Sequence, residues 1–360
     1  MSQPDASTAV LLLAHGTPNV LGEMAEYLAK VTGGRALPHE VVEELQHRYA
    51  QIGLRDSPGE QPPPLTRWTL AQARSLEAAL AAAGTPLRVY VGMRNWHPYI
   101  ADVVGQMRAD GVTRLIAVCL APQNSRTSTG LYLRTLIAAL QAKSAQNPSA
   151  PAPSLTFIES WSDEPALIEA FTQRLIDLCT KLGAPEPALS LPKGLDSQTW
   201  EGEPENQLAA TSLPVLFTAH SVPCRTIQSS ESNPTPDPYP VEAKRTAELV
   251  FQSAMRQLPN LKKYFFAFQS QGVAGGPWIG PTVEETLAAI CAEGHAALVL
   301  QPIGFLCDHV EILYDIDIAF AQRARTLGLR LFRTESLNDS PLLTQALLRV
   351  VLGQLTTHNS

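Results

Sequence analysis

Residues 9–18 read AVLLLAHGTP, and residues 214–223 read PVLFTAHSVP. In both stretches a continuously apolar run leads into a histidine, and a proline follows three residues later. Continuously apolar runs are typical of strands that are buried on both faces of a parallel sheet. Two further apolar runs follow each stretch, and the last of them ends close to Pro122 in one case and to Pro302 in the other. The matching order predicts two similar halves that face each other.

Apolar runs alternate with helical patterns along the rest of the chain. The expected strands are Ala9–Ala14, Leu87–Val91, Arg114–Leu120, Leu155–Glu159, Pro214–Ala219, Tyr264–Phe268 and Ala296–Gln301. The expected helices are Leu65–Ala83, Ile100–Asp110, Pro165–Leu182, Val241–Gln257, Val283–Gly294, Asp308–Gly328 and Pro341–Leu355. This alternation favours a doubly wound α/β architecture with parallel sheets.

Four stretches rich in proline and polar residues are expected to be loops or linkers, because proline fixes φ and lacks an N–H group. They are residues 54–65, 143–154, 183–214 and 228–240. The third is long for a bare loop, so we interpret it as an insertion or a flexible loop. We place the first half at residues 1–155 and the second half, which carries the candidate metal site, at residues 156–360.

The composition excludes several classes of protein. Hydrophobic residues make up 45% and charged residues 17% of the chain, which excludes global disorder. The net charge of −7 lacks the basic footprint of a nucleic-acid-binding protein. No apolar run approaches the ~20 residues of a membrane span, and the first residues show no secretory signal. We therefore expect a cytoplasmic protein with no integral membrane segment and no nucleic-acid partner, and we favour a monomer.

His15 and His220 occupy equivalent places after the two leading strands. Ligands of open parallel sheets bind beyond the carboxyl ends of the strands, so both imidazoles are candidates for a site between the halves. The alternative interpretation for either one is a histidine that hydrogen-bonds a turn.

Acidic residues open the helix that follows the strand predicted at Ala296–Gln301. Asp308, Glu311 and Asp315 lie at i, i+3 and i+7, on one helical face. Asp308 and Glu311 have the spacing of a capping box, and three acids on one face are also typical of a solvated surface. A carboxylate beside the imidazole of His220 would instead make a labile site for a divalent metal such as Fe(II) or Zn(II). We interpret the neighbouring His309 as structural.

Seven motifs occur in order along nearly the whole chain, from about Val10 to about Leu355. They are LLLAHGTP, GMRNWHP, ESWSDEP, FTAHSVP, DPYP, QSQGVAGGPWIGP and GFLCDHVEILYDID. Together they resemble the motifs of the ferrochelatase family, the enzymes that insert Fe(II) into a porphyrin. The resemblance implies a chelatase-like fold, in which two Rossmann-like halves surround a porphyrin cleft.

The resemblance also implies roles for individual residues. His220 resembles the family's metal-binding and proton-accepting histidine, and Glu311 resembles its partner carboxylate, so these two are the implied catalytic residues. Asp315 resembles part of the acidic path for incoming cations, which makes it a third implied metal ligand. The residues leave open whether Glu311 orients His220, stabilises its imidazolium form or shares the iron.

Further residues resemble the porphyrin contacts of coproporphyrin-type members. They are Arg48, Tyr49, Ser57 and Tyr132. From the residues alone, Arg48 would be assigned to a surface ion pair and Tyr132 to ordinary helix packing.

The chain departs from the family's pattern in two respects. Many coproporphyrin-type members carry a tyrosine in place of His15, on the porphyrin face opposite the catalytic histidine. Because a neutral imidazole is a good iron ligand, we predict that His15 is an axial ligand to the product iron. Some members bind a [2Fe–2S] cluster through cysteines near the C-terminus, but no cysteine follows Cys307, so we predict neither a cluster nor another prosthetic group.

We therefore expect an enzyme of haem biosynthesis whose substrates are ferrous iron and a porphyrin. Coproporphyrin III, with four propionates, is favoured over protoporphyrin IX, with two, because the chain has no long apolar lip that could dock on a membrane. The alternatives are a chelatase for another metal or tetrapyrrole, a non-catalytic haem or porphyrin carrier on the same fold, and a periplasmic-type ligand-binding protein. A carrier would have no need for both His220 and Glu311.

Overall fold

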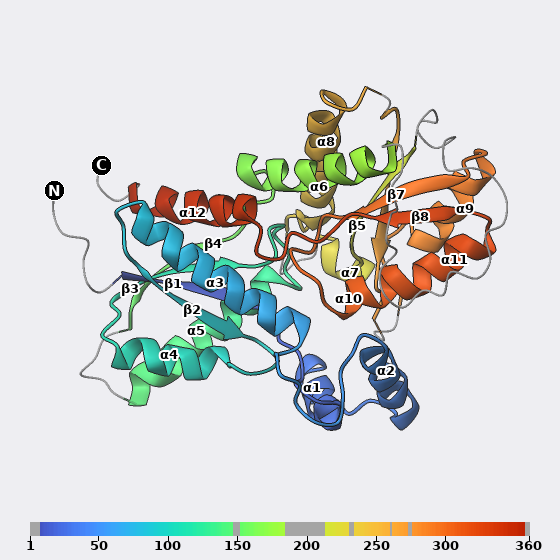
Figure 1. Cartoon of the computed structure of the whole chain (residues 1–360). Helices are drawn as coiled ribbons and strands as arrows, with labels where there is room; N and C mark the ends of the chain where they lie inside the picture. The colour runs from blue at the N-terminus through green and yellow to red at the C-terminus, as the bar shows by residue number, and fades with distance from the viewer. Residues whose placement is uncertain are drawn as a thin grey trace.

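The computed structural model describes residues 8–146, 152–183, 213–229, 234–259, 261–272 and 276–356. These residues contain two parallel four-stranded sheets with matching strand orders, β2-β1-β3-β4 and β6-β5-β7-β8 (Figure 1). The strands are β1 (Thr8–Ala14), β2 (Arg88–Met93), β3 (Arg114–Cys119), β4 (Ser154–Ile158), β5 (Val215–His220), β6 (Tyr264–Gln269), β7 (Ala297–Pro302) and β8 (Arg330–Arg333). The predicted architecture of two similar α/β halves is confirmed.

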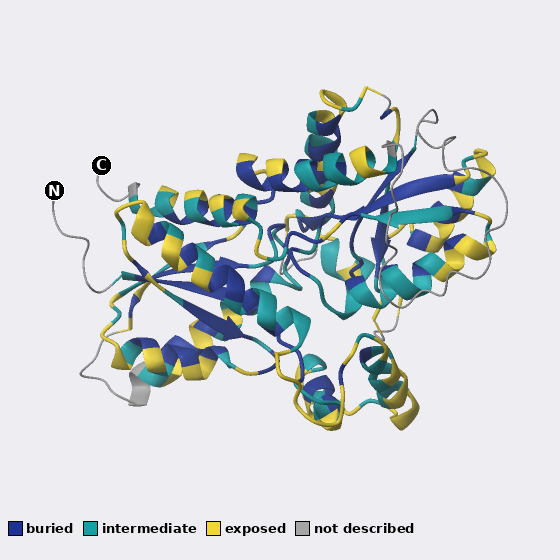
Figure 2. Cartoon of the chain, in the orientation of Figure 1, coloured by how far each residue is buried: buried dark blue, intermediate teal, exposed yellow. Residues whose placement is uncertain are grey.

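Helices cover both faces of each sheet, and their outward faces are exposed while the strands between them are buried (Figure 2). The longer helices are α1 (Met24–Val31), α2 (His39–Gln51), α3 (Pro64–Ala82), α4 (Ile100–Ala109), α5 (Thr129–Gln146), α6 (Pro165–Gly183), α8 (Tyr239–Met255), α9 (Val283–Ala292) and α12 (Pro341–Thr356). The shorter ones are η1 (Leu21–Glu23), α7 (Cys224–Ile227), α10 (Val310–Leu313), the π-helix η3 (Asp315–Phe320) and α11 (Ala321–Thr326).

The apolar runs at β1, β3, β5 and β7 form the central strands of the two sheets, where nearly every residue is buried. In β1, Val10 and Leu12 belong to a core that includes α3, whereas Leu11 and Leu13 belong to a separate core with α4 and α5. Successive side chains of a strand point to opposite faces, so a continuous apolar run serves both cores. The same division holds around β5, where α6 and α8 cover one face and α9 to α11 cover the other.

Two helices cross between the halves. α6 follows β4 in the chain but packs against α8, and α12 follows β8 but packs against α3 (Figure 1). The side chain of Arg114 on β3 donates a hydrogen bond of 2.8 Å to the carbonyl of Gln354 on α12. The crossing helices share one hydrophobic core that includes residues of both sheets, so the halves are joined by packing as well as by the chain.

Every predicted strand is present to within two residues at either end. Six elements of the described residues were not predicted: η1, α1, α2, α5, α7 and β8. β8 is short, lies at the edge of its sheet, and has Arg330 and Arg333 at its two ends, so it contains no apolar run. The loop predicted at residues 143–154 is partly wrong, because α5 continues to Gln146.

The single helix predicted over Asp308–Gly328 is also wrong. The segment is divided into α10, the π-helix η3 and α11. Most of the predicted insertion, residues 184–212, lies outside the described residues, as do residues 230–233 of the last predicted loop. The division of the chain between residues 155 and 156 stays a prediction.

Candidate active site

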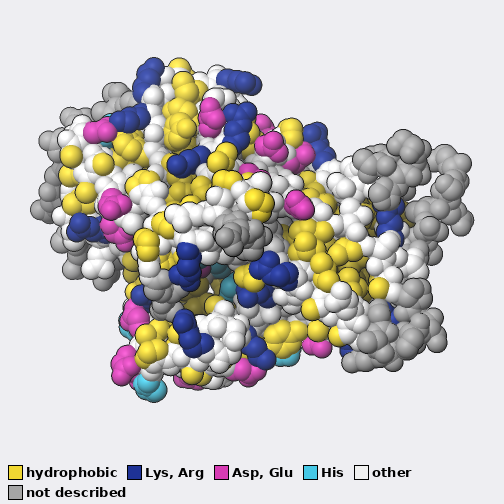
Figure 3. Space-filling model, turned by 180° about the vertical axis from the view of Figure 1, so that it is seen from behind, with side chains coloured by type: hydrophobic (Ala, Val, Ile, Leu, Met, Phe, Trp, Pro, Cys, Tyr) yellow, Lys and Arg dark blue, Asp and Glu magenta, His cyan; other side chains and the backbone are white. Residues whose placement is uncertain are grey.

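A cavity of about 540 Å³ is lined by residues of both halves, at the carboxyl ends of β1 and β5. His15 and Tyr132 contribute from the first half, and His220 and Glu311 contribute from the second. Figure 3 shows Lys and Arg side chains around a hollow near the middle of one face of the molecule. The volume is typical of a small-molecule site, and the position is where ligands of open α/β sheets bind.

The imidazole of His220 is held in one orientation at the end of β5. Its Nδ1 contacts the backbone carbonyl of Ser221. A carbonyl oxygen can only accept, so Nδ1 carries the proton and Nε2 is the unprotonated nitrogen of the neutral ring. The hydroxyl of Tyr239 donates a hydrogen bond of 2.8 Å to the carbonyl of His220, which fixes the strand end.

Nε2 of His220 lies 3.5 Å from Oε1 of Glu311. The second carboxylate oxygen, Oε2, is buried and has no hydrogen bond among the described residues, and its distance to Nε2 of His309 is 4.0 Å. Burial lowers the pKa of His309, which disfavours its charged form. A buried carboxylate oxygen without a partner is costly. A lone pair that faces such a carboxylate therefore favours a proton or a metal cation between the two groups.

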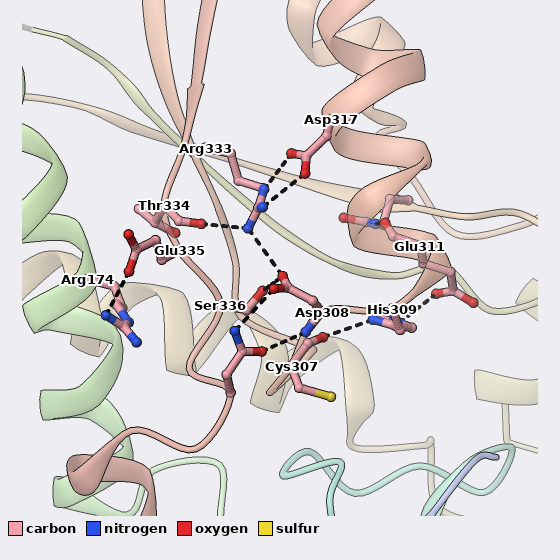
Figure 4. A network of polar contacts seen from close by, with 12 residues as sticks. Arg174, Cys307, Asp308, His309, Glu311, Asp317, Arg333, Thr334, Glu335 and Ser336 are labelled. Atoms are coloured by element: carbon pink, nitrogen blue, oxygen red, sulfur yellow. Dashed lines mark hydrogen bonds and ion pairs between the residues drawn. The ribbon is translucent and has the colours of Figure 1, made fainter. Parts of the chain in front are cut away.

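The capping-box interpretation of Asp308 and Glu311 is wrong. The N-cap residue of α10 is His309, and no side chain caps the helix. The carboxylate of Asp308 instead accepts hydrogen bonds of 2.7 Å from Ser336 and 3.1 Å from Asn338 (Figure 4). Because Asp308 precedes the helix, the three acids do not share one helical face. The carboxylate of Glu311 lies against the imidazole of His220 and does not cap the helix.

Asp315 and Arg48 lie outside the cavity lining. Asp315 begins the π-helix, and Ser270 donates a hydrogen bond to it. Burial, together with the charge of Glu311, raises the pKa of Asp315 to about 6. Arg48 forms an ion pair of 3.0 Å with Glu44, as the interpretation from the residues alone has it. The roles of Asp315 as a metal ligand and of Arg48 as a porphyrin contact stay predictions.

The three other predicted porphyrin contacts line the cavity: Tyr49, Ser57 and Tyr132. Tyr49 and Tyr132 are buried, whereas Ser57 is exposed. Burial raises the pKa of Tyr49 to about 12 and raises the pKa of Tyr132 further above its ordinary value. Both phenols therefore stay neutral and can donate a hydrogen bond.

His15 lines the cavity directly after β1, so the two strand-end histidines reach the same cavity from opposite halves. Gly16 makes the turn that follows, with φ +90°, and a Cβ atom there would lie 2.7 Å from the backbone nitrogen of Trp96. The amide nitrogen of Asn95 lies 3.1 Å from Nε2 of His15. Burial lowers the pKa of His15 to about 4, so its ring is neutral at pH 7 and keeps one unprotonated nitrogen.

Comparison with known proteins identifies the family. The profile described as ferrochelatase matches residues 7–355. The chain belongs to the ferrochelatase family. It is 49% identical over 355 residues to the ferrochelatase of Acidobacterium capsulatum, which covers 96% of this chain and 94% of that one. It is 30% identical over 352 residues to the coproporphyrin III ferrochelatase of Geobacillus thermodenitrificans, which covers 97% of this chain and 96% of that one.

Ferrochelatases are enzymes of haem biosynthesis that insert iron into a porphyrin, and this chain is such an enzyme. Among solved structures, it is similar to the sirohydrochlorin chelatase SirB of Bacillus subtilis subspecies spizizenii in complex with cobalt, with a TM-score of 0.48 and 12% identity. That match covers 96% of this chain and 94% of the other.

The described residues of the ferrochelatase contain neither a candidate membrane-spanning helix nor a cluster of metal-ligating side chains. No helix among them has the length and apolar character needed to cross a bilayer. No group of three or more His, Cys, Asp or Glu side chains among them could hold a metal ion.

Arg94 is among the cavity residues of the ferrochelatase that were not singled out from the sequence. Arg94, in the motif GMRNWHP, follows β2 and lines the cavity, and burial lowers the pKa of its guanidinium. Met93 pairs with Ala14 in the sheet, so Arg94 and His15 follow neighbouring strand ends. The rule that selected His15 also applies to Arg94, because every parallel strand ends at the same edge of its sheet.

Proposed function

We propose that this ferrochelatase inserts Fe(II) into coproporphyrin III, with His220 as the base that removes the pyrrole protons and Glu311 as the carboxylate that stabilises the resulting imidazolium. The observation that supports these roles is the distance of 3.5 Å between Nε2 of His220 and Oε1 of Glu311 at the wall of the cavity. The free-base porphyrin loses two N–H protons as one Fe(II) enters. The site must therefore accept protons where it also handles a cation.

The geometry suits this proton transfer. The carbonyl of Ser221 already fixes the tautomer of His220, so Glu311 is not needed for orientation and is available to balance charge. The side chains of His220 and Glu311 are 38% and 28% exposed, so a proton taken from the porphyrin can leave to solvent before the second one is removed. Histidine is suited to this cycle because its ordinary pKa is close to neutrality.

The charges around the cavity support coproporphyrin III as the porphyrin. Three arginines contribute to the lining: Arg55, Arg67 and Arg94. Guanidinium groups bind carboxylates through charge-assisted hydrogen bonds. Four propionates can use more of these groups than two can. The polar side chains of Ser57 and Thr127 in the lining add further donors.

An anaerobic assay with Fe(II) and either porphyrin tests this preference. We expect kcat/KM to be at least about tenfold higher for coproporphyrin III than for protoporphyrin IX, because each charged hydrogen bond that is lost costs about 1.5–3 kcal/mol. Absorbance of the metallated product gives the rate. An equal or higher kcat/KM for protoporphyrin IX would overturn the preference. Tight porphyrin binding without turnover would instead support a carrier.

We also propose that His15 ligates the product iron on the face opposite His220. Replacing His15 with alanine is then expected to change the visible spectrum of the bound iron porphyrin, because an axial nitrogen ligand is lost. His47 on α2 is exposed and lies outside the cavity lining, so His47→Ala is the matched control. A His15→Ala enzyme with an unchanged product spectrum and unchanged turnover would contradict the proposal.

The absence of a [2Fe–2S] cluster remains part of the proposal. Its basis is the lack of any cysteine after Cys307. Analysis of the purified enzyme for acid-labile sulfide tests it.

A further inference from the structure

Arg333, the last residue of β8, binds on both sides of the segment that carries Glu311 (Figure 4). Its Nε and Nη2 donate hydrogen bonds of 2.5 and 2.9 Å to the two carboxylate oxygens of Asp317 in the π-helix. Its Nη1 lies 3.7 Å from Oδ1 of Asp308, which precedes α10. One guanidinium group therefore connects a residue before Glu311 with a residue after it. The Arg333 side chain is only 18% exposed, and a two-pronged contact of this kind fixes geometry as well as charge.

Asn338 holds the same segment from the loop that follows β8. Its Oδ1 accepts a hydrogen bond of 2.9 Å from the backbone nitrogen of Asp308, and its Nδ2 donates one of 3.1 Å to the Asp308 carboxylate. Its backbone nitrogen donates to the carbonyl of Leu306. The residue has φ +51°, a conformation that asparagine tolerates better than most residues. Gln72 on α3 donates a hydrogen bond of 2.6 Å to the Asn338 carbonyl, which connects this loop to the first half.

These anchors matter because α10 cannot place Glu311 by itself. The helix has a single turn and no side-chain cap. A single turn is unstable without tertiary contacts, because the conformational entropy lost in helix nucleation exceeds the free energy gained from one hydrogen bond. The backbone carbonyl of Glu311 accepts one hydrogen bond, of 2.8 Å, from Gln269 at the end of β6. Arg333 and Asn338 supply the contacts on the other side of the segment.

We infer that Arg333 is a positioning residue for iron insertion, which acts with Asn338 through Asp308 and Asp317 to hold the Glu311 carboxylate against His220. None of the four residues lines the cavity, so they act through Glu311 and not on the porphyrin. The inference rests on the proposed role of Glu311. Loss of an outer partner of this kind costs about 10- to 100-fold in activity, and a displacement of ~1 Å at a reacting group costs a similar factor.

A double-variant cycle between Arg333 and Glu311 tests the inference. We expect Arg333→Gln to lower kcat for Fe(II) insertion by about 10- to 100-fold with unchanged porphyrin affinity, measured by quenching of porphyrin fluorescence. In a Glu311→Gln background, the same substitution is expected to cause no further loss, because the group that it positions is already disabled. A purely structural role would produce equal losses in both backgrounds.

Arg174→Gln is the matched control. Arg174 pairs with Glu335 at 3.1 Å, in the same connection after β8, but it contacts neither Asp308 nor Asp317 (Figure 4). Its turnover is expected to match that of the unmodified enzyme.

The possible outcomes separate the two proposals. Wild-type kcat in Arg333→Gln, or a full further loss in the double variant, would overturn the positioning role. If Arg333→Gln does not fold, the same cycle is measured with Asn338→Gly. Glycine adopts the positive φ of this position, so the substitution removes only the amide side chain. Wild-type turnover in Glu311→Gln alone would refute the proposed function of Glu311 itself.

Discussion

Replacing His220 with alanine is expected to abolish iron insertion while porphyrin binding survives. The imidazole supplies the lone pair that lies 3.5 Å from the Glu311 carboxylate, and general-base catalysis contributes about 10²- to 10⁴-fold to a rate. Binding should persist because His220 is one of many residues around the cavity, and the tyrosines and arginines of the first half remain in place. Anaerobic assays with Fe(II) and coproporphyrin III give turnover, and quenching of porphyrin fluorescence gives affinity.

His39→Ala is a matched control for this variant. His39 also faces a carboxylate, that of Glu43, at 3.4 Å, but its side chain is 80% exposed on α2 and lies outside the cavity lining. Its removal should leave turnover unchanged. Near-normal insertion by His220→Ala would contradict the assignment of the base, and loss of porphyrin binding would show that His220 serves mainly to hold the substrate.

The sequence predicts the two halves and the strand-end histidines of the site, because these features depend on local patterns. An apolar run that is buried on both faces ends in a histidine, and the parallel arrangement brings all such ends to one edge. His15 and His220 follow from that rule, and the cavity contains both. The same rule extends to Arg94, but its strand does not end in the repeated A-H pattern, so no repeat marks the residue.

The environment of Glu311 could not be predicted in this way. The i, i+3 spacing is typical of a capping box formed by Asp308 and Glu311. In the structure, the Asp308 carboxylate instead accepts hydrogen bonds from Ser336 and Asn338 and pairs with Arg333. Those partners come from β8 and the loop after it, a strand with no apolar run to mark it. Tertiary hydrogen bonds therefore determine the position of Asp308, and local sequence spacing does not encode them. The crossing of α6 and α12 between the halves escaped prediction for a related reason, since amphipathic periodicity shows which face of a helix is apolar but not which sheet it covers.

Replacing Glu311 with glutamine is expected to lower turnover by about 10²-fold or more while the fold and the porphyrin affinity are kept. The amide has nearly the shape of the carboxylate but no charge, so it cannot stabilise an imidazolium at 3.5 Å. Loss of a pre-organised electrostatic partner in an active site costs about 10²- to 10³-fold. The substitution tests the charge, because Oε2 has no hydrogen bond among the described residues that a glutamine would break. Steady-state turnover and thermal unfolding of the variant test the expectation.

Glu285→Gln is a control that distinguishes the electrostatic role of Glu311 from a helix-capping role. It stands in a genuine capping box, where its carboxylate accepts a hydrogen bond of 2.8 Å from the backbone nitrogen of Thr282 and its own backbone nitrogen donates to the Thr282 hydroxyl. Glu285→Gln should change stability by no more than ~1 kcal/mol and leave turnover intact, since capping contributes about that much and an amide oxygen can still accept. A Glu311→Gln enzyme that behaves like Glu285→Gln would show that Glu311 has only a structural role. A large loss of turnover confined to Glu311→Gln, with an unchanged unfolding temperature, would assign its charge to the insertion step.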